Sequence, residues 1–180
     1  MNLAYTHLLP SDFSATSRVW IYQAPRLFSL AEAFAIEDRI DQFSAQWQSH
    51  GQPVKGKGFL FFGQFIVLLA DQTATMVSGC STDSSVALIK KLEQEFSTSL
   101  LDRTQLAFVV GDKIERLPLA QIDYALEKGF ITATTLYFNN TVATKEELEK
   151  NWIVPVSQSW LSKRLTRQGG LSGTEQVRDR

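Results

Sequence analysis

Hydrophobic residues recur along the first part of the chain with two different periods, and these periods predict its elements. A run rich in β-branched and aromatic residues predicts a strand over 18–23, which Pro25 ends. Ser29 and Glu32 have the spacing of a capping box, so a helix is expected to begin there. The apolar stripe of this helix is expected to consist of Leu30, Phe34, Ile40, Phe43 and Trp47.

The middle of the chain predicts two buried strands and a second helix. Glycine-rich residues 49–58 are expected to form a loop, and the apolar runs 59–62 and 65–70 to form strands that meet at Gly63-Gln64. Another loop is expected over 71–79. The second helix is expected to begin near Ser81 or Thr82 and to bury Val86, Ile89, Leu92 and Phe96.

The last third alternates between strand and helix signals. Residues 106–117 predict a β-hairpin that turns at Gly111-Asp112, followed by a short helix from Leu119 to Gly129. A strand is expected over 135–138.

The chain then shows a second capping-box pattern. Thr144 and Glu147 open a helix that is expected to carry Leu148 and Trp152 and to end or kink at Pro155, after which Trp160 and Leu165 continue a helical pattern. Together the elements predict an α+β (mixed α/β) fold with a mixed, largely antiparallel sheet packed against helices. Residues 1–166 are expected to form one domain, in which residues 105–156 are a candidate for a separate sub-lobe. Residues 167–180 are expected to form a disordered tail.

The composition is sufficient for a hydrophobic core, and the balanced charge produces no strong electrostatic field around the protein. The chain of 180 residues is 44% hydrophobic, and its 18 basic residues balance 19 acidic ones. A nucleic-acid partner is therefore not expected. The longest apolar run, 59–70, is too short to span a bilayer, and residues 1–10 lack the features of a signal peptide. The lone cysteine, Cys80, suits a reducing compartment, so a cytoplasmic protein without membrane insertion is expected.

A near-match to a phosphate-binding loop runs from Gly51 to Gly58. Gly51, Gly56 and Lys57 have Walker A spacing, but Gly58 replaces the hydroxyl residue that binds magnesium. The segment also follows a predicted helix and precedes a predicted strand, which is the reverse of a phosphate loop. The sequence therefore argues against ATP hydrolysis and predicts no cofactor.

Residues 79–85 hold the best candidate for catalysis. A thiol just before a helix lies near the positive end of the helix dipole, so Cys80 is a candidate nucleophile, His50 its base and Asp83 the group that orients the base. The alternative is that the polar residues only cap the helix and that Cys80 is a small buried residue. Two histidines and one cysteine without short spacings predict no metal site.

Large aromatic residues offer a second kind of site. Most are expected in the core, but a partly exposed tryptophan or tyrosine is a good anchor for a peptide. Trp20, Tyr22 and Trp152 are the candidates.

The chain resembles one family along most of its length. The resemblance is carried by Arg18-Val19-Trp20-Ile21-Tyr22, by Trp47-Gln48-Ser49-His50, by 79–85, by Leu101-Asp102-Arg103 and by Phe138-Asn139-Asn140. These segments are similar to a family of uncharacterised Bacteroidetes proteins that carries the description "ABC transporter ATPase". That description implies ATP hydrolysis, yet the Leu-Ser-Gly-Gly-Gln signature of such ATPases has only Gly170-Leu171-Ser172-Gly173 as its nearest match here.

A second, local resemblance covers about 105–155. The hairpin at Gly111-Asp112, Gly129-Phe130-Ile131, 135–138 and Trp152 resemble a GYF-like module, which implies binding to a protein or peptide. Arg116-Leu117-Pro118-Leu119 stands in place of the Gly-Pro-Phe segment of those modules. The favoured function is thus a non-catalytic interaction or adaptor role, and the alternative is a cysteine-dependent enzyme. The sequence does not predict an oligomeric state.

Overall fold

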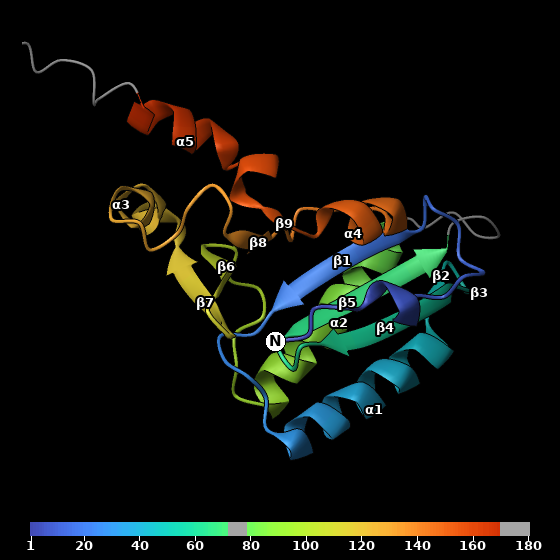
Figure 1. The fold of residues 1–180 in the computed structure, drawn as a ribbon. Coiled ribbons are helices and arrows are strands. Elements are labelled where there is room, and N and C mark those ends of the chain that lie inside the picture. Colours follow the sequence, from blue (N-terminus) through green and yellow to red (C-terminus); the bar gives the residue numbers. More distant parts are fainter. Residues whose placement is uncertain (72–78, 170–180) are drawn as a thin grey trace, which may run out of the picture. The chain divides into compact units, whose positions relative to one another are not determined.

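The computed structural model describes residues 1–71 and 79–169, and side chains except those of 79–81 and 166–169. Helices and antiparallel sheets confirm the predicted α+β class (Figure 1). Every strand pair that the described residues form is antiparallel. The chain divides into two compact units. Unit 1 contains Met1, Arg103–Asn139 and Ile153–Arg180, and unit 2 contains Asn2–Asp102 and Asn140–Trp152.

Unit 2 is built on a three-stranded sheet in the order β1-β5-β4. Its strands are β1 (Arg18–Gln23), β4 (Lys55–Phe61) and β5 (Phe65–Asp71). All seven residues of the central strand β5 are buried. A strand buried on both faces needs a layer on each side of the sheet, which explains its continuous apolar run from Phe65 to Ala70.

One face of this sheet is covered by α1 (Leu30–Gln46) and α2 (Gly79–Glu95), as Figure 1 shows. These helices and the sheet share a core that includes Ile36, Ile40, Ile66, Leu68, Ala70, Ile89 and Leu92. Of the predicted core residues of α2, Ile89 and Leu92 are buried in this core, whereas Val86 is only partly buried. Phe43 and Phe96 pack against the same core while remaining partly buried.

The other face is covered by the N-terminal segment, with η1 (Thr6–Leu8), and by α4 (Lys145–Asn151). The ring of Trp152 lies 4.8 Å from that of Tyr5, 5.8 Å from that of Phe61 and 5.5 Å from that of Phe65. Burial, with a contribution from Glu149, raises the pKa of Tyr5 to about 12.

Two glycines of β4 let α1 approach the sheet closely. A Cβ atom at Gly56 would lie 2.5 Å from Cε3 of Trp47. At Gly58 it would overlap Cγ2 of Ile40 and lie 2.8 Å from Cδ2 of Leu68. The glycines were predicted to belong to a loop over 49–58, but they lie in strand β4, so this prediction is wrong. Because glycine has no side chain, α1 can pack directly on this strand.

The rest of that predicted loop also has structure. Strands β2 (Gln48–Ser49) and β3 (Gln52–Pro53) pair across a turn at His50 and Gly51. Both turn residues have a positive φ, 51° and 75°. Glycine adopts this conformation freely, whereas a residue with a Cβ atom does so rarely.

The start of α1 confirms the predicted capping box. The side chain of Ser29 accepts the backbone N–H of Glu32, and a carboxylate oxygen of Glu32 accepts the backbone N–H of Ser29. Arg26 donates two hydrogen bonds to the same carboxylate at 2.7 and 2.8 Å. These bonds lower the pKa of Glu32 from 4.5 to about 2, chiefly through Arg26.

The apolar stripe predicted for α1 is wrong in its first half. Leu30 and Phe34 are 73% and 60% exposed, whereas Ile36 and Ile40 are buried. At about 100° per residue, Phe34 and Ile36 lie about 160° apart around the helix axis. Leu30 and Phe34 therefore belong to the outer face of α1.

Unit 1 contains a four-stranded sheet in the order β7-β6-β8-β9. Strands β6 (Gln105–Val110) and β7 (Lys113–Pro118) form the predicted hairpin, whose turn contains Gly111 at φ 60°. The remaining strands are β8 (Leu136–Phe138) and β9 (Ile153–Pro155). The helix predicted to continue past Trp152 is thus wrong, because residues 153–155 pair with β8 instead.

The helices of unit 1 complete its own core. They are η2 (Leu119–Gln121), α3 (Ile122–Glu127), η3 (Val156–Gln158) and α5 (Ser162–Gly169). The core consists of Phe108, Ile122, Ala125, Leu126, Ile131, Tyr137, Val156 and Leu161. Residues 167–169 of the predicted tail lie within α5, and the rest of the tail lies outside the described residues. Of the loop predicted over 71–79, Asp71 belongs to β5 and Gly79 to α2, and residues 72–78 lie outside the described residues.

We predict that Gly58→Ala lowers the free energy of unfolding by about 1–3 kcal/mol, because the new methyl group overpacks the contact between α1 and β4. Chemical denaturation measures this loss. Ile40→Ala removes the nearer of the two clashing atoms, while Cδ2 of Leu68 remains, so the double variant should lose less stability than the two single losses added together. Strict additivity would contradict the proposed contact.

We predict a pH-dependent contribution from Glu32. Its lowered pKa stabilises the folded state at and above pH 4.5, and this contribution is lost as the pH falls from 4.5 towards 2. Thermal unfolding should show Glu32→Gln to be less stable than the wild type at pH 7, with a smaller difference near pH 2. Glu37→Gln, on the same helix, is the control. An equal difference at both pH values would contradict the account.

Candidate functional site

The catalytic residues predicted from sequence lie on two elements of unit 2. The backbone of Cys80 is in the first turn of α2, since this helix begins at Gly79 and not at Ser81 or Thr82 as expected. The side chain of Cys80 lies outside the described part of the chain. Asp83 is exposed on α2, and His50 is exposed in the turn after β2. Because α2 contacts β2, the two elements are neighbours, and the catalytic triad stays a prediction.

Two of the three aromatic anchors predicted from sequence are core residues. Tyr22 is 2% exposed, and its hydroxyl lies 3.4 Å from Oγ of Ser85. Trp152 is fully buried, and its indole N–H donates to Oδ1 of Asn140 at 2.9 Å. Neither side chain meets the condition of partial exposure on which the binding prediction rests, because both pack against the central sheet.

Trp20 is partly buried and belongs to the same face of the sheet as α1. Its ring lies 5.7 Å from that of Trp47, and the guanidinium of Arg18 lies 5.4 Å from its centre. It packs against the core of unit 2. These contacts give Trp20 a structural role in unit 2, and its role as a binding anchor stays a prediction.

The residues of the near-match to a phosphate loop have partners within unit 2. Lys57 donates to Asp41 at 2.8 Å, and Lys55 forms ion pairs with Asp12 at 2.9 Å and with the buried Asp71 at 3.4 Å. The ammonium of Lys55 also lies 4.7 Å from the ring centre of Phe13. The hydrogen bond from Lys55 lowers the pKa of Asp12. Both lysines thus bind carboxylates of the protein itself.

Within 1–71 and 79–169, no three His, Cys, Asp or Glu side chains are grouped so that they could hold a metal ion. In the same part of the chain, no helix has the length and apolar character needed to cross a membrane.

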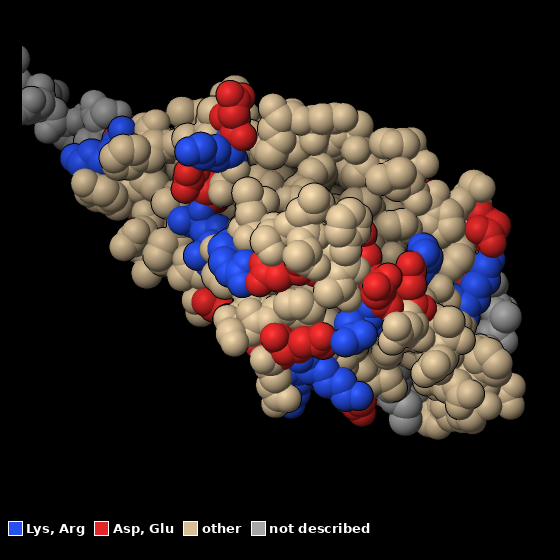
Figure 2. Space-filling model, turned by 90° about the horizontal axis from the view of Figure 1, so that it is seen from below, with Lys and Arg blue, Asp and Glu red and all other residues tan. Residues whose placement is uncertain are grey.

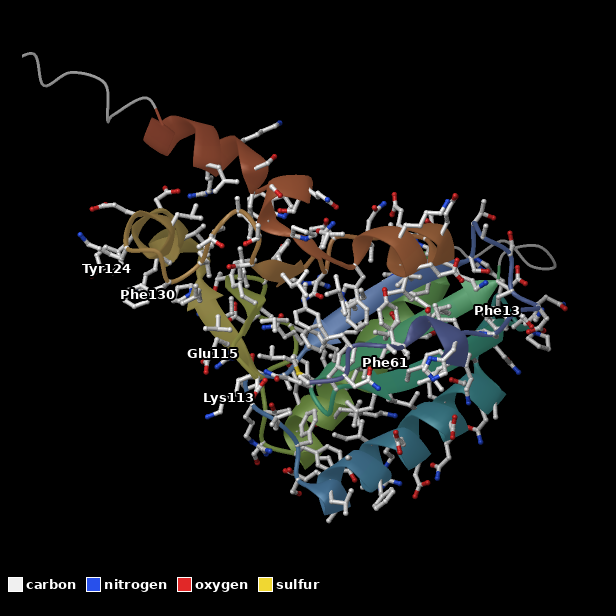
Figure 3. All side chains as sticks on the ribbon, viewed as in Figure 1. Phe13, Phe61, Lys113, Glu115, Tyr124 and Phe130 are labelled. Carbon is white, nitrogen blue, oxygen red and sulfur yellow. The ribbon has the colours of Figure 1, made fainter. Side chains whose placement is uncertain are left out.

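Unit 1 exposes a pair of aromatic side chains at the end of α3. Tyr124 and Phe130 are 57% and 64% exposed, and their ring centres lie 6.4 Å apart at an angle of 39°. Figure 3 shows the two labelled side chains next to each other at the surface. The ammonium of Lys128 lies 5.7 Å from the ring of Tyr124. These three side chains, the α3 aromatic pair with its lysine, form an apolar surface with one flanking positive charge.

The backbone around this pair is well fixed. Gly129 ends α3 with φ 72°, and its N–H donates to the carbonyl of Leu126 at 3.2 Å. The N–H groups of Phe130 and Ile131 both donate to the carbonyl of Ala125, at 2.9 and 3.3 Å. The sequence showed the glycine cap, but it held no signal that Phe130 would turn outward while Ile131 turned into the core.

Unit 2 exposes a second apolar surface. Leu27, Leu30 and Phe34 are 63%, 73% and 60% exposed, and the last two lie on the outer face of α1. The signal for this surface was present in the sequence, because at about 100° per residue Phe34 and Leu30 lie about 160° and 120° from Ile36 around the helix axis. We call these three residues the α1 apolar patch.

A cavity of about 280 Å³ lies beside α1, at the open edge of β4. Its walls include Leu8, Ile40 and Phe59, and the charged side chains Glu37, Asp41 and Lys57 also line it. Phe61, which Figure 3 labels, lines it too and stacks on Phe59 with ring centres 5.0 Å apart.

Comparison with known proteins adds no family or relative. No family model, no curated protein and no solved structure matches the chain. The described surfaces and side chains are therefore the basis of the function proposed for this protein.

Proposed function

We propose that the protein is a non-catalytic interaction protein, which binds another protein or a peptide through the α3 aromatic pair. The observation that carries this proposal is the exposure of Tyr124 and Phe130, 57% and 64%, side by side on a fixed backbone. Exposed rings of this kind are costly to hydrate, and their burial by a partner is favourable. Tyrosine and other aromatic side chains often dominate the binding energy of an interface.

The rigidity of the pair favours binding over a purely structural role. Ile122, Ala125 and Leu126 anchor α3 in the core of unit 1, while Tyr124 lies on the opposite side of the same helix. Phe130 is held by the hydrogen bond from its N–H to Ala125. A surface that is already ordered loses little conformational entropy when it binds.

The two rings of the pair have different surroundings, because a lysine lies beside only one of them among the described residues. Lys128 lies over one side of the Tyr124 ring, and its ammonium is 3.1 Å from the carboxylate of Glu127. Among the side chains that the structure describes, no ammonium or guanidinium lies over the ring of Phe130 as Lys128 lies over Tyr124, so this ring is the better receptor for an apolar side chain of the partner. The expected ligand is therefore a peptide with an apolar or aromatic anchor.

We predict that Phe130→Ser weakens peptide binding by about 10-fold or more while leaving stability nearly unchanged. Peptides would first be selected from a random displayed library on the wild-type protein, and their affinities then measured by fluorescence anisotropy. Val110→Ser changes an exposed apolar residue of the same unit, at the tip of the hairpin, and is the matched control.

Two outcomes would contradict this proposal. One is that the double variant Tyr124→Ser/Phe130→Ser selects the same peptides from the library as the wild type does. The other is that selected peptides bind Phe130→Ser as tightly as they bind the wild type. A large loss of stability in Phe130→Ser would instead assign this ring to the core, against its 64% exposure.

Cysteine-dependent chemistry is the second candidate, and the start of α2 favours it. The first turn of a helix stabilises a thiolate, and the backbone of Cys80 lies in that turn. On this candidate, iodoacetamide alkylates Cys80 faster at pH 7 in the folded protein than in the chain unfolded by denaturant, and His50→Ala slows the reaction. Slower alkylation in the folded protein would dismiss the candidate.

A further inference from the structure

The outer face of α1 is apolar in its first two turns and acidic in the next two. The α1 apolar patch occupies the first part. Glu37, Asp38 and Asp41 follow three, four and seven residues after Phe34, so they lie on the same side of the helix. All three are exposed. Figure 2, drawn from the side of α1, shows acidic and basic side chains beside uncharged surface.

Two carboxylates in the acidic half of this face lack an ion-pair partner among the described residues. Asp41 is paired with Lys57, but neither Glu37 nor Asp38 forms an ion pair with any residue that the structure describes. Arg39, which follows Asp38 in sequence, donates two hydrogen bonds of 2.9 and 3.2 Å to Glu95, and its positive charge also interacts with Asp38. The surface next to the apolar patch is therefore negative.

The cavity beside α1 adds a place for a long side chain. Glu37 is at its wall, and Leu8, Ile40 and Phe59 supply apolar surface. A lysine or arginine has an aliphatic stem that buries well against apolar walls and a charged end that needs a carboxylate or water. The combination of apolar walls and the carboxylate of Glu37 suits such a side chain.

From these observations we infer that the outer face of α1 binds a basic amphipathic segment of another protein. Apolar side chains of the segment cover Leu30 and Phe34, and its lysine or arginine side chains face Glu37 and Asp38. One of these cationic side chains enters the cavity between α1 and the edge of β4. This surface belongs to unit 2 and the α3 aromatic pair to unit 1, so the inference adds a second partner to the proposed function.

A second copy of this chain is a poorer occupant. If two α1 helices paired in parallel, each acidic half would lie against the other. If they paired antiparallel, the acidic half of one would cover the apolar patch of its partner. The first arrangement brings like charges together, and the second desolvates carboxylates without pairing them. An anionic membrane is disfavoured for the same reason, because it would repel Glu37 and Asp38.

The test uses two synthetic amphipathic helices labelled with fluorescein. One has leucine on its apolar face and lysine on its polar face, and the other has glutamate in place of each lysine. We expect the lysine peptide to bind at least about 10-fold more tightly than the glutamate peptide, and added salt to weaken its binding. Anisotropy measures both affinities on the full-length protein.

Variants of α1 locate the binding. Phe34→Ser should weaken binding of the lysine peptide by about 10-fold, and Glu37→Lys/Asp38→Lys by at least as much. The controls are Val110→Ser, which removes an exposed apolar residue of unit 1, and Glu115→Lys, which reverses an exposed charge there. Thermal unfolding of every variant shows whether it is folded.

Three results would overturn this inference. The first is equal affinity for the two peptides. The second is unchanged binding of the lysine peptide to folded Phe34→Ser or to folded Glu37→Lys/Asp38→Lys. The third is a dimer of the wild type, seen in sedimentation, that Phe34→Ser dissolves, because a second copy would then occupy the α1 apolar patch.

Discussion

The complete burial of β5 is the constraint on which unit 2 depends. All seven of its residues are buried, so the sheet needs cover on both faces. On one face α1 and α2 supply Ile36, Ile40, Ile89 and Leu92. On the other, Tyr5 and Trp152 pack near Phe65. The strand therefore determines where the helices and the N-terminal segment lie.

That constraint also separates core side chains from those available for binding. Tyr22 and Trp152 are large aromatic residues, but Tyr22 points from β1 into the core of unit 2 and Trp152 packs against Phe65 of β5. Gly56 and Gly58 give up their side chains so that α1 can pack on β4. With Ile36 and Ile40 turned to the sheet, Leu30 and Phe34 are left on the outside of α1. The orientation of α1 that buries Ile36 and Ile40 thus also exposes Leu30 and Phe34.

Much of the fold could be predicted from sequence where local chemistry decides the structure. The capping pattern of Ser29 and Glu32, the hairpin turn at Gly111 and the glycine end of α3 are local signals, and each holds. The part of β4 over 55–58 was missed because its glycines are required by close packing against α1, which is remote in sequence. Strand β9 was missed because pairing with β8 overrides the apparent helical spacing around Pro155.

The binding surfaces were harder to predict than the fold. An apolar residue in a sequence has the same character whether it is buried or exposed, and only its neighbours in space decide which. The helical spacing of Phe34 and Ile36 could have revealed that they diverge, but nothing local distinguishes the exposed Phe130 from the buried Ile131. Cys80, His50 and Asp83 stood out because their chemistry is unusual, and their joint action remains a prediction.

The most direct test of an interaction function is a map of where a selected peptide binds. Backbone amide signals of the isotope-labelled protein, followed by NMR during titration with the peptide, provide that map. The account predicts that the largest shifts fall within residues 122–131, around Tyr124 and Phe130. Shifts centred on His50 and Asp83 instead would contradict it and would direct attention to cysteine chemistry.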